Sequence, residues 1–198
     1  MLRLTVTFVM VLAISGCTSQ QQSKPQTLHN AEFNWTITIP EGFESVPSEE
    51  WEKMQNKGAQ AVQNTYGEKV ENLSTVIFVF RKGQFNYLEA NYQPFDPAID
   101  GDYQASCKGV NEILYETFRT QMPNASLDSL SSVQSVSGLE FQKFDITIDL
   151  PNGVKLRSQM YSRLFGDKDF SVNIMYADEE PGEKMTTAWL SSVFQSGN

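Results

Sequence analysis

The residues best suited to hold a metal ion are three aspartates in FDPAIDGDY, residues 95–103. Asp96, Asp100 and Asp102 lie in this short segment, ahead of a long helical pattern. With loop carbonyl groups they could bind Ca²⁺, which accepts oxygen ligands in a flexible geometry. Their spacing does not match an EF-hand, and aspartates before a helix also cap its first amides and favour its dipole. Calcium binding is the functional hypothesis, and capping is the interpretation that the residue types favour.

An aromatic segment, QFNYLEANYQPF at residues 84–95, offers a second kind of binding chemistry. It carries Phe85, Tyr87, Tyr92 and Phe95. An exposed Tyr87 or Tyr92 could stack on a sugar or anchor a protein partner, because tyrosine combines apolar area with a polar tip. Alternation along a half-buried strand instead predicts most of these rings in the core. Tyr87, Tyr92 and Phe95 are therefore the candidate residues for binding a ligand or partner.

Sets of residues that could perform catalysis are not recognisable in the sequence. It has one histidine, His29, and lacks a CxxC pair, a phosphate-binding loop and a dinucleotide glycine motif. The serines of SSVQSVSG and WLSSVF do not form a GxSxG nucleophile elbow. Cys107 falls on one face of a helical pattern, which predicts a core residue and not a nucleophile. We therefore expect a protein that is not an enzyme and that uses no cofactor.

The first half of the chain contains a strand, a helix and a hairpin. FNWTITIP, residues 33–40, alternates apolar and polar residues, which predicts a strand with one buried face. Ser48 can cap a short helix that begins at Glu49. The apolar run STVIFVFRKG, residues 74–83, is followed by a turn and by the aromatic segment. These two runs are expected to pair as an antiparallel hairpin.

The second half begins with a long helix, expected from about Asp102 to Met122. Strand patterns follow at residues 133–136, 139–150, 154–165 and 170–177. The short turns between them favour an antiparallel meander. The last element is a helix in GEKMTTAWLSSVFQS, whose predicted buried face comprises Met185, Ala188, Trp189 and Val193. This order predicts an α+β fold in which helices cover a mostly antiparallel sheet.

The N-terminal residues 1–16 have the layout of a secretory signal peptide. Arg3 precedes an apolar run of about eleven residues, whereas a membrane-spanning helix needs roughly 20. The run ends in ISGC, residues 14–17, which resembles the lipobox of bacterial lipoproteins. The resemblance implies that Cys17 is lipidated and becomes the first residue of the mature chain, since several acyl chains bind a membrane firmly. The alternative is an ordinary secretory peptide with Cys17 near its cleavage site.

The segment after this cysteine is polar and aperiodic. Residues 17–30 are therefore expected to form a lipidated, flexible tether, and residues 31–198 a single α+β domain. The resemblance to lipoproteins implies export to the outer membrane rather than retention in the inner one, because Thr18 stands where Asp would favour retention. Removing residues 1–16 changes the formal net charge from −9 to about −10. Such an acidic chain argues against nucleic acid as a partner.

The order of elements resembles the PsbP-like and DcrB-like families. The similarity is carried by FNWTITIPEGFESV, residues 33–46, a strand followed by Pro, Gly and an aromatic residue, and by the closing WLSSVF, residues 189–194. It implies a three-layer α/β/α domain that binds or assists other proteins without catalysis. The resemblance does not identify any individual functional residue in this chain.

Two functional hypotheses follow. The first is a membrane-anchored envelope lipoprotein, a non-enzymatic binding or accessory module for an envelope protein complex. The second is a surface lipoprotein that binds, or hydrolyses, a glycan or small ligand through residues 85–95 and the three aspartates. A concave pocket joining Tyr87 or Tyr92 to carboxylates would favour the second hypothesis.

Overall fold

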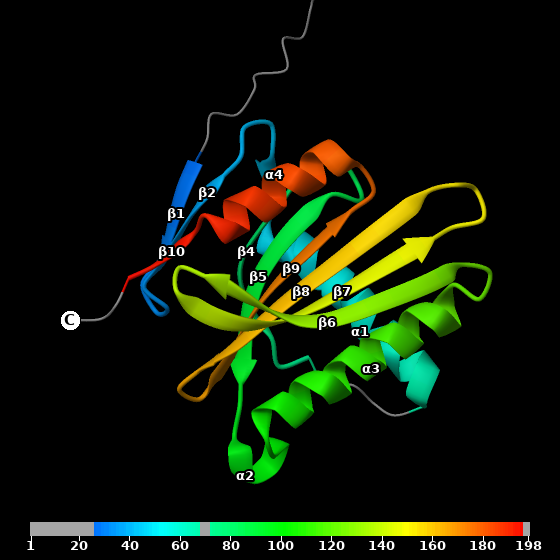
Figure 1. The fold of residues 1–198 in the computed structure, drawn as a ribbon, viewed down its shortest axis with the longest axis horizontal. Helices are drawn as coiled ribbons and strands as arrows, with labels where there is room; N and C mark the ends of the chain where they lie inside the picture. Colours follow the sequence, from blue (N-terminus) through cyan, green and yellow to red (C-terminus); the bar gives the residue numbers. More distant parts are fainter. Residues whose placement is uncertain (1–25, 68–71, 196–198) are drawn as a thin grey trace, which may run out of the picture.

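The computed structural model describes residues 26–67 and 72–195 (Figure 1). The expected signal peptide and the lipidation site at Cys17 lie outside these residues. Most of the expected tether lies outside them as well. None of the described helices is long and apolar enough to cross a lipid bilayer.

The main sheet has seven antiparallel strands. Their order across the sheet is β3 (Glu44–Ser45), β4 (Thr75–Arg81), β5 (Tyr87–Pro94), β9 (Lys168–Tyr176), β8 (Lys155–Phe165), β7 (Leu139–Asp149) and β6 (Ser126–Val136). A second, three-stranded sheet has the order β1 (Gln26–Asn30), β2 (Trp35–Ile39) and β10 (Val193–Phe194). The helices are α1 (Ser48–Tyr66), α2 (Pro97–Asp100), α3 (Tyr103–Gln121) and α4 (Glu179–Leu190). The predicted α+β class, with helices flanking antiparallel strands, is confirmed.

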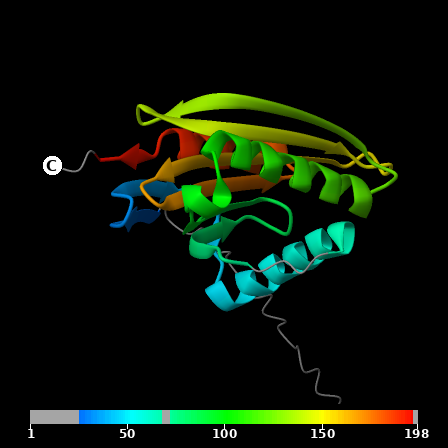
Figure 2. The same cartoon turned by 90° about the horizontal axis from the view of Figure 1, so that it is seen from below.

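The main sheet separates two different layers. On one face, α4 and the small sheet enclose an aromatic core that includes Trp35, Phe141, Phe170 and Trp189. Trp35 and Trp189 are fully buried, and their rings meet edge to face at 5.9 Å. On the other face lie α1 and α3 (Figure 2). Burial of these large side chains supplies the main driving force for folding, because stabilisation scales with apolar area removed from water.

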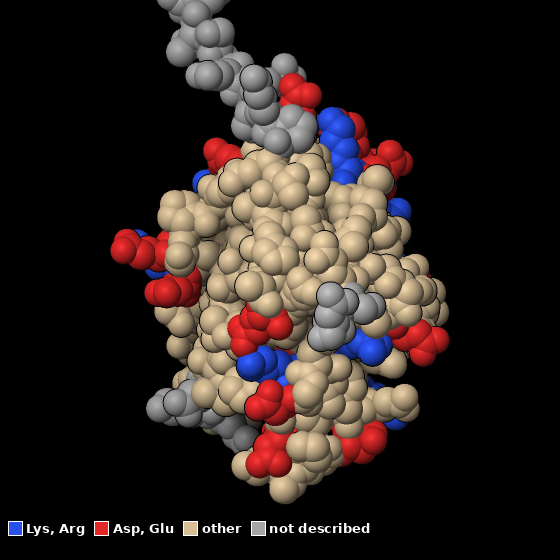
Figure 3. Space-filling view, turned by 90° about the vertical axis from the view of Figure 1, so that its left-hand side faces the viewer, with Lys and Arg blue, Asp and Glu red and all other residues tan. Residues whose placement is uncertain are grey.

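The small sheet begins earlier than expected. β1 pairs with β2 from Gln26, opposite Ile39, to Asn30, opposite Trp35. Residues 26–30 are therefore a strand and not part of a flexible tether; their backbone groups pair with β2 although their side chains are mostly exposed. On this side of the molecule charged side chains gather around a broad uncharged area (Figure 3), and the three strands themselves contain no Lys, Arg, Asp or Glu.

Two helix predictions also need correction. α1 spans 19 residues instead of a short stretch, and Ser48 is its first residue, while the capping position is Pro47 with no side-chain bond. The last helix ends at Leu190, so Val193 belongs to β10, where its side chain is 47% exposed. Pairing of Val193 with Thr36 in β2 accounts for the change from helix to strand. Met185, Ala188 and Trp189 are buried as predicted.

Candidate functional site

The face of the sheet beneath α1 and α3 has a polar centre. At one end, Trp51 of α1 packs against Val79 of β4. At the other, Phe118 of α3 packs with Ile146 of β7 and neighbouring apolar side chains. Between these two apolar clusters the strands present polar side chains. The helices α1 and α3 therefore each cover an apolar cluster, and a polar strip of the sheet lies between the two clusters.

A cleft of about 200 Å³ opens over this strip. We call it the polar cleft. Its lining is Gln55, Ser74, Glu89, Asn91, Gln93, Ser106, Cys107, Val110, Met160, Ser162, Asp169, Ser171 and Asn173. The lining contains two carboxylates and, among the described residues, no Lys, Arg or His. The polar cleft is therefore a concave site of negative charge.

Glu89 is the third residue of β5, and only 7% of its surface is exposed. It is opposite Asn173 of β9 and Val79 of β4. Its Oε1 accepts a hydrogen bond from Gln55 Nε2 of α1 at 2.8 Å, and its Oε2 accepts one from Asn173 Nδ2 at 3.4 Å. Neutral amides therefore hold this buried carboxylate in place.

Asp169 is the second carboxylate, at the start of β9. Its Oδ1 accepts a bond from the Tyr103 hydroxyl at 2.8 Å, and its Oδ2 accepts one from Gln93 Nε2 at 3.3 Å. Burial raises the pKa of Asp169, and the two hydrogen bonds offset part of that rise. Burial, followed by the nearby Asp169 charge, also raises the pKa of Tyr103, which therefore stays protonated and remains a donor.

Within residues 26–67 and 72–195, neither Glu89 nor Asp169 forms an ion pair. A buried carboxylate normally has a charged partner, because removing it from water is costly. In the strand register the two residues are separated by four positions, about 13 Å at 3.3 Å per residue. The cleft thus offers two separate negative groups to a cation that enters it.

Cys107 of α3 also lines the cleft and is half-buried. Burial raises the pKa of its thiol, with Asp169 and Asp102 adding to the effect. A raised pKa disfavours the thiolate, which is the reactive form. The helical face predicted around Cys107 is only partly confirmed, since Val110 on that face is 40% exposed.

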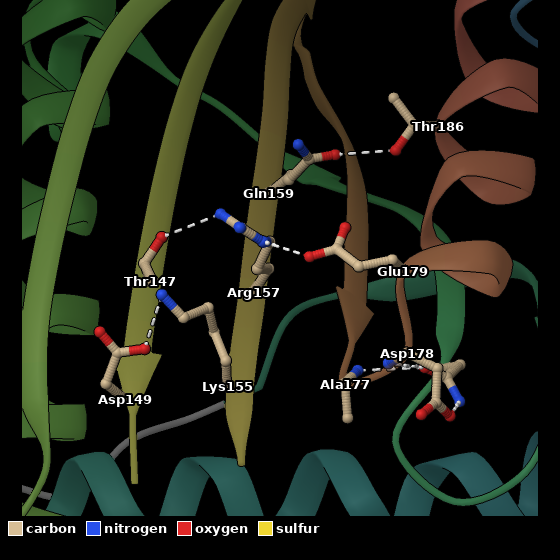
Figure 4. Close-up of polar contacts among 10 residues, drawn as sticks. Thr147, Asp149, Lys155, Arg157, Gln159, Ala177, Asp178, Glu179 and Thr186 are labelled. Atoms are coloured by element: carbon tan, nitrogen blue, oxygen red, sulfur yellow. Dashed lines mark hydrogen bonds and ion pairs between the residues drawn. The ribbon is translucent and has the colours of Figure 1, made fainter. Parts of the chain in front are cut away.

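A second polar group lies on the opposite face of the sheet, beside α4 (Figure 4). Arg157 of β8 contacts Glu179 of α4 at 3.3 Å and Thr147 of β7 at 3.5 Å. Lys155 and Asp149 form an ion pair at 2.9 Å. Opposite charges are matched here, and the contacts join α4 to the sheet, so we assign this group a structural role.

The three aspartates of residues 95–103 accept hydrogen bonds from backbone amides of their own segment. Asp96 caps α2 by accepting from the Ala98 amide at 2.9 Å, and Asp102 caps α3 by accepting from the Ala105 amide at 2.9 Å. Asp100 accepts from the Asp96 amide at 2.7 Å. In the described part of the chain, no group of three or more His, Cys, Asp or Glu side chains is placed to hold a metal ion. The geometry supports capping and gives calcium binding no support.

The structure does not bring the aromatic candidates together. Tyr87 lies beneath α1, with its ring 4.8 Å from that of Trp51, whereas Tyr92 lies on the opposite face, 5.4 Å from Phe33. Phe95 is buried and packs edge to face on Tyr103 at 5.3 Å. Tyr87 and Tyr92 therefore do not share one pocket, because odd and even residues of β5 point to opposite faces.

Comparisons with known proteins bear on the fold. No family model matches the chain, and no curated protein matches it. The solution structure of cyanobacterial PsbP (CyanoP) from Synechocystis sp. PCC 6803 is similar, with a TM-score of 0.56 and 9% identity over 92% of this chain and 99% of that chain. The Ran-binding protein Mog1p of Saccharomyces cerevisiae gives a TM-score of 0.39 and 10% identity over 84% of this chain and 85% of that chain. The first similarity shows that this chain has a PsbP-like fold.

Proposed function

We propose that this protein is a lipid-anchored, non-enzymatic accessory module of the bacterial cell envelope, whose polar cleft binds a basic side chain of a partner protein. The observation that carries the proposal is the presence of two carboxylates, the buried Glu89 and the half-buried Asp169, in one cleft that has no basic residue in its lining. The PsbP-like fold is compatible with an accessory role.

The size and chemistry of the polar cleft favour the end of a single side chain. A volume of about 200 Å³ is below the range of roughly 300–1,000 Å³ that is usual for drug-sized ligands. An ammonium or guanidinium group could form charge-assisted bonds with Glu89 or Asp169, which are stronger than bonds between neutral groups. The amide oxygens of Asn91 and Gln93 offer further acceptors at the cleft.

The anchor is the second part of the proposal. Cys17 ends the lipobox-like ISGC sequence, and we propose that lipid on its thiol and amino group holds the domain at the membrane, with the outer membrane as the destination. Replacing Cys17 by Ser is expected to move the protein from the membrane fraction to the soluble fraction of the envelope. Membrane association that is unchanged in Cys17→Ser would contradict lipid anchoring.

Partner binding is tested by crosslinking in intact cells, followed by affinity purification and mass spectrometry. The site variant is Glu89→Gln with Asp169→Asn, which keeps both shapes and removes both charges. The control is Glu52→Gln with Glu183→Gln, which removes two exposed charges elsewhere. We expect one protein to be recovered with the native chain and the control and to be reduced about tenfold or more with the site variant.

Two outcomes would overturn this proposal. Equal recovery of the partner with the site variant would show that the carboxylates do not take part. Recovery of no protein, together with saturable binding of a free amine such as spermidine to the purified chain, would assign the cleft to a small ligand instead.

A further inference from the structure

β6 forms one free edge of the main sheet. It is 11 residues long and pairs with β7 along its whole length, from Ser126 to Val136, without a bulge. In Figure 2 it runs along the upper edge, with no described element beyond it. The opposite edge strand, β3, has only two residues. The two edges therefore differ greatly in how much backbone they expose.

This edge lacks the features that usually prevent pairing between sheets. Its sequence, SLDSLSSVQSV, has one charged residue, Asp128, and no Pro, Lys or Arg. Residues 128–133 are all exposed, and the exposed fractions of Leu130 and Val133 reach 64% and 56%. A long, regular, weakly charged edge with exposed apolar side chains is a template for another strand.

The turn after β6 determines which backbone groups face outward. Ser137 and Gly138 have φ values of 52° and 80°, as in a type I′ turn, and they join Val136 to Leu139. These flanking residues form the hydrogen-bonded pair of such a hairpin, so the even residues of β6 bond to β7. The odd residues then direct their N–H and C=O groups to the free edge.

Side-chain contacts agree with this assignment. The Ser129 amide donates to its neighbour Asp128 at 2.9 Å, and the Leu127 carbonyl accepts from the Tyr115 hydroxyl at 3.5 Å. In the described part of the chain, the outward groups of Ser131 and Val133 have no such side-chain partner. The edge is thus only partly satisfied by its own side chains.

We propose that a second copy of this chain pairs with β6, antiparallel and centred on Leu130, and joins the two main sheets into one. The two copies are related by a two-fold axis perpendicular to the sheet, so each face of one main sheet continues into the same face of the other. Each residue of β6 then lies opposite the residue of the second copy for which the two residue numbers sum to 260. Leu130 then faces Leu130 of the second copy, and Leu127 faces Val133. The single charge, Asp128, faces Ser132, so like charges do not meet.

Other registers lose this match. Moving the centre by one residue places Leu130 opposite Asp128 or opposite Ser132. In the proposed register the three apolar side chains of β6 that are not fully buried, Leu127, Leu130 and Val133, all pair with apolar side chains, which is the feature that fixes register in sheets. The pairing would replace the bond between Asp128 and the Ser129 amide. It leaves the polar cleft uncovered, so this inference is independent of the proposed function.

Disulfide trapping tests both the dimer and its register. The full chain carries Cys17→Ser and Cys107→Ser, which leaves no other cysteine. Leu130 would form a non-hydrogen-bonded pair with its own copy, with Cα atoms about 4.5 Å apart, within disulfide reach. Leu130→Cys is therefore expected to give a covalent dimer under mild oxidation. The matched control is Ser132→Cys, whose two copies would lie about 13 Å apart and cannot bridge.

Sedimentation of the native chain provides the second measurement, with Leu130→Lys as the variant, since it places two positive charges opposite each other. We expect the native chain to form a dimer and the variant to weaken it by about tenfold or more, with unchanged circular dichroism. A native chain that stays monomeric at all concentrations overturns the proposal. Equal crosslinking through Leu130→Cys and Ser132→Cys overturns the register.

Discussion

The hydroxyl of Tyr103, the first residue of α3, donates to the carboxylate of Asp169 in β9 across 2.8 Å. The bond joins the start of the helix to the start of a central strand, 66 residues apart in sequence. It positions the half-buried carboxylate of the polar cleft and holds α3 over that cleft. Because both groups are partly buried, the energetics of this pair depend on whether Asp169 carries a charge.

Asp169→Asn is expected to raise stability at neutral pH. Burial raises the pKa of Asp169 above 3.8, so the native state binds its proton more tightly than the unfolded chain. Its contribution to stability is therefore complete below the unfolded pKa and is lost as pH rises through the folded pKa. Removing the charge should stabilise the protein at pH 7 by about 1 kcal/mol, or raise Tm by roughly 2–4 °C.

Thermal unfolding at several pH values checks this expectation. The advantage of the variant should be present at pH 7 and disappear at low pH, where Asp169 is protonated. A variant that is less stable than the native chain at pH 7 would contradict the assignment of an unpaired, costly charge at this position.

Cys107 should react slowly with alkylating reagents. Burial raises its pKa above 9.0, which lowers the thiolate fraction at neutral pH. The rate of reaction with iodoacetamide is expected to rise at a higher pH in the folded protein than in the chain unfolded by urea. The measurement uses Cys17→Ser, so that Cys107 is the only thiol. Identical pH profiles for the folded and unfolded chains would refute the raised pKa.

Ser192→Ala should destabilise the domain. The indole N–H of Trp35 donates to Ser192 Oγ at 2.9 Å inside the core, and the alanine leaves this donor without a partner. The expected loss is about 1–3 kcal/mol. Ser191→Ala is the matched control, because Ser191 is exposed and bonds the end of its own helix at Thr187. Urea unfolding should separate the two variants clearly.

Two glycine-to-alanine changes should have opposite effects. A Cβ at Gly182 of α4 would clash with the ring of Tyr176, so Gly182→Ala forces that buried ring to move. The expected cost is about 1–3 kcal/mol. Gly58 lies in α1 with open space around the same position, and Gly58→Ala should stabilise by about 0.5–1 kcal/mol. A denaturant midpoint that does not fall in Gly182→Ala would contradict the packing at Gly182.

The sequence predicts those elements whose periodicity is local. The hairpin of β4 and β5, the long helix α3 and the three long strands β7, β8 and β9 were recognisable from alternation, helical spacing and short turns. α1 is different, because only Trp51 is buried in its 19 residues and no apolar stripe marks its length. Its Glu, Lys, Gln and Ala residues have high helix propensity, and that signal was available.

The polar cleft could not be read from local patterns. Glu89 alternates with the buried Leu88 and Ala90, which predicts a side chain facing away from the core and into water. Only the pairing of β5 with β9 places it opposite Asn173, 84 residues away, and only the packing of α1 covers it. β1 was missed for a similar reason, since its polar residues become a strand only by pairing with β2.

The position of β1 determines how the domain would respond to a mechanical load applied through its N-terminal chain. That chain enters β1 at Gln26, which pairs with Ile39, the residue at which β2 ends. A pull from this side would load the β1–β2 ladder at its end and separate its residue pairs one after another. Peeling the five residues of β1 would add about 17 Å of reach while the main sheet stays intact. The strand would then act as an extensible link between the load and the core.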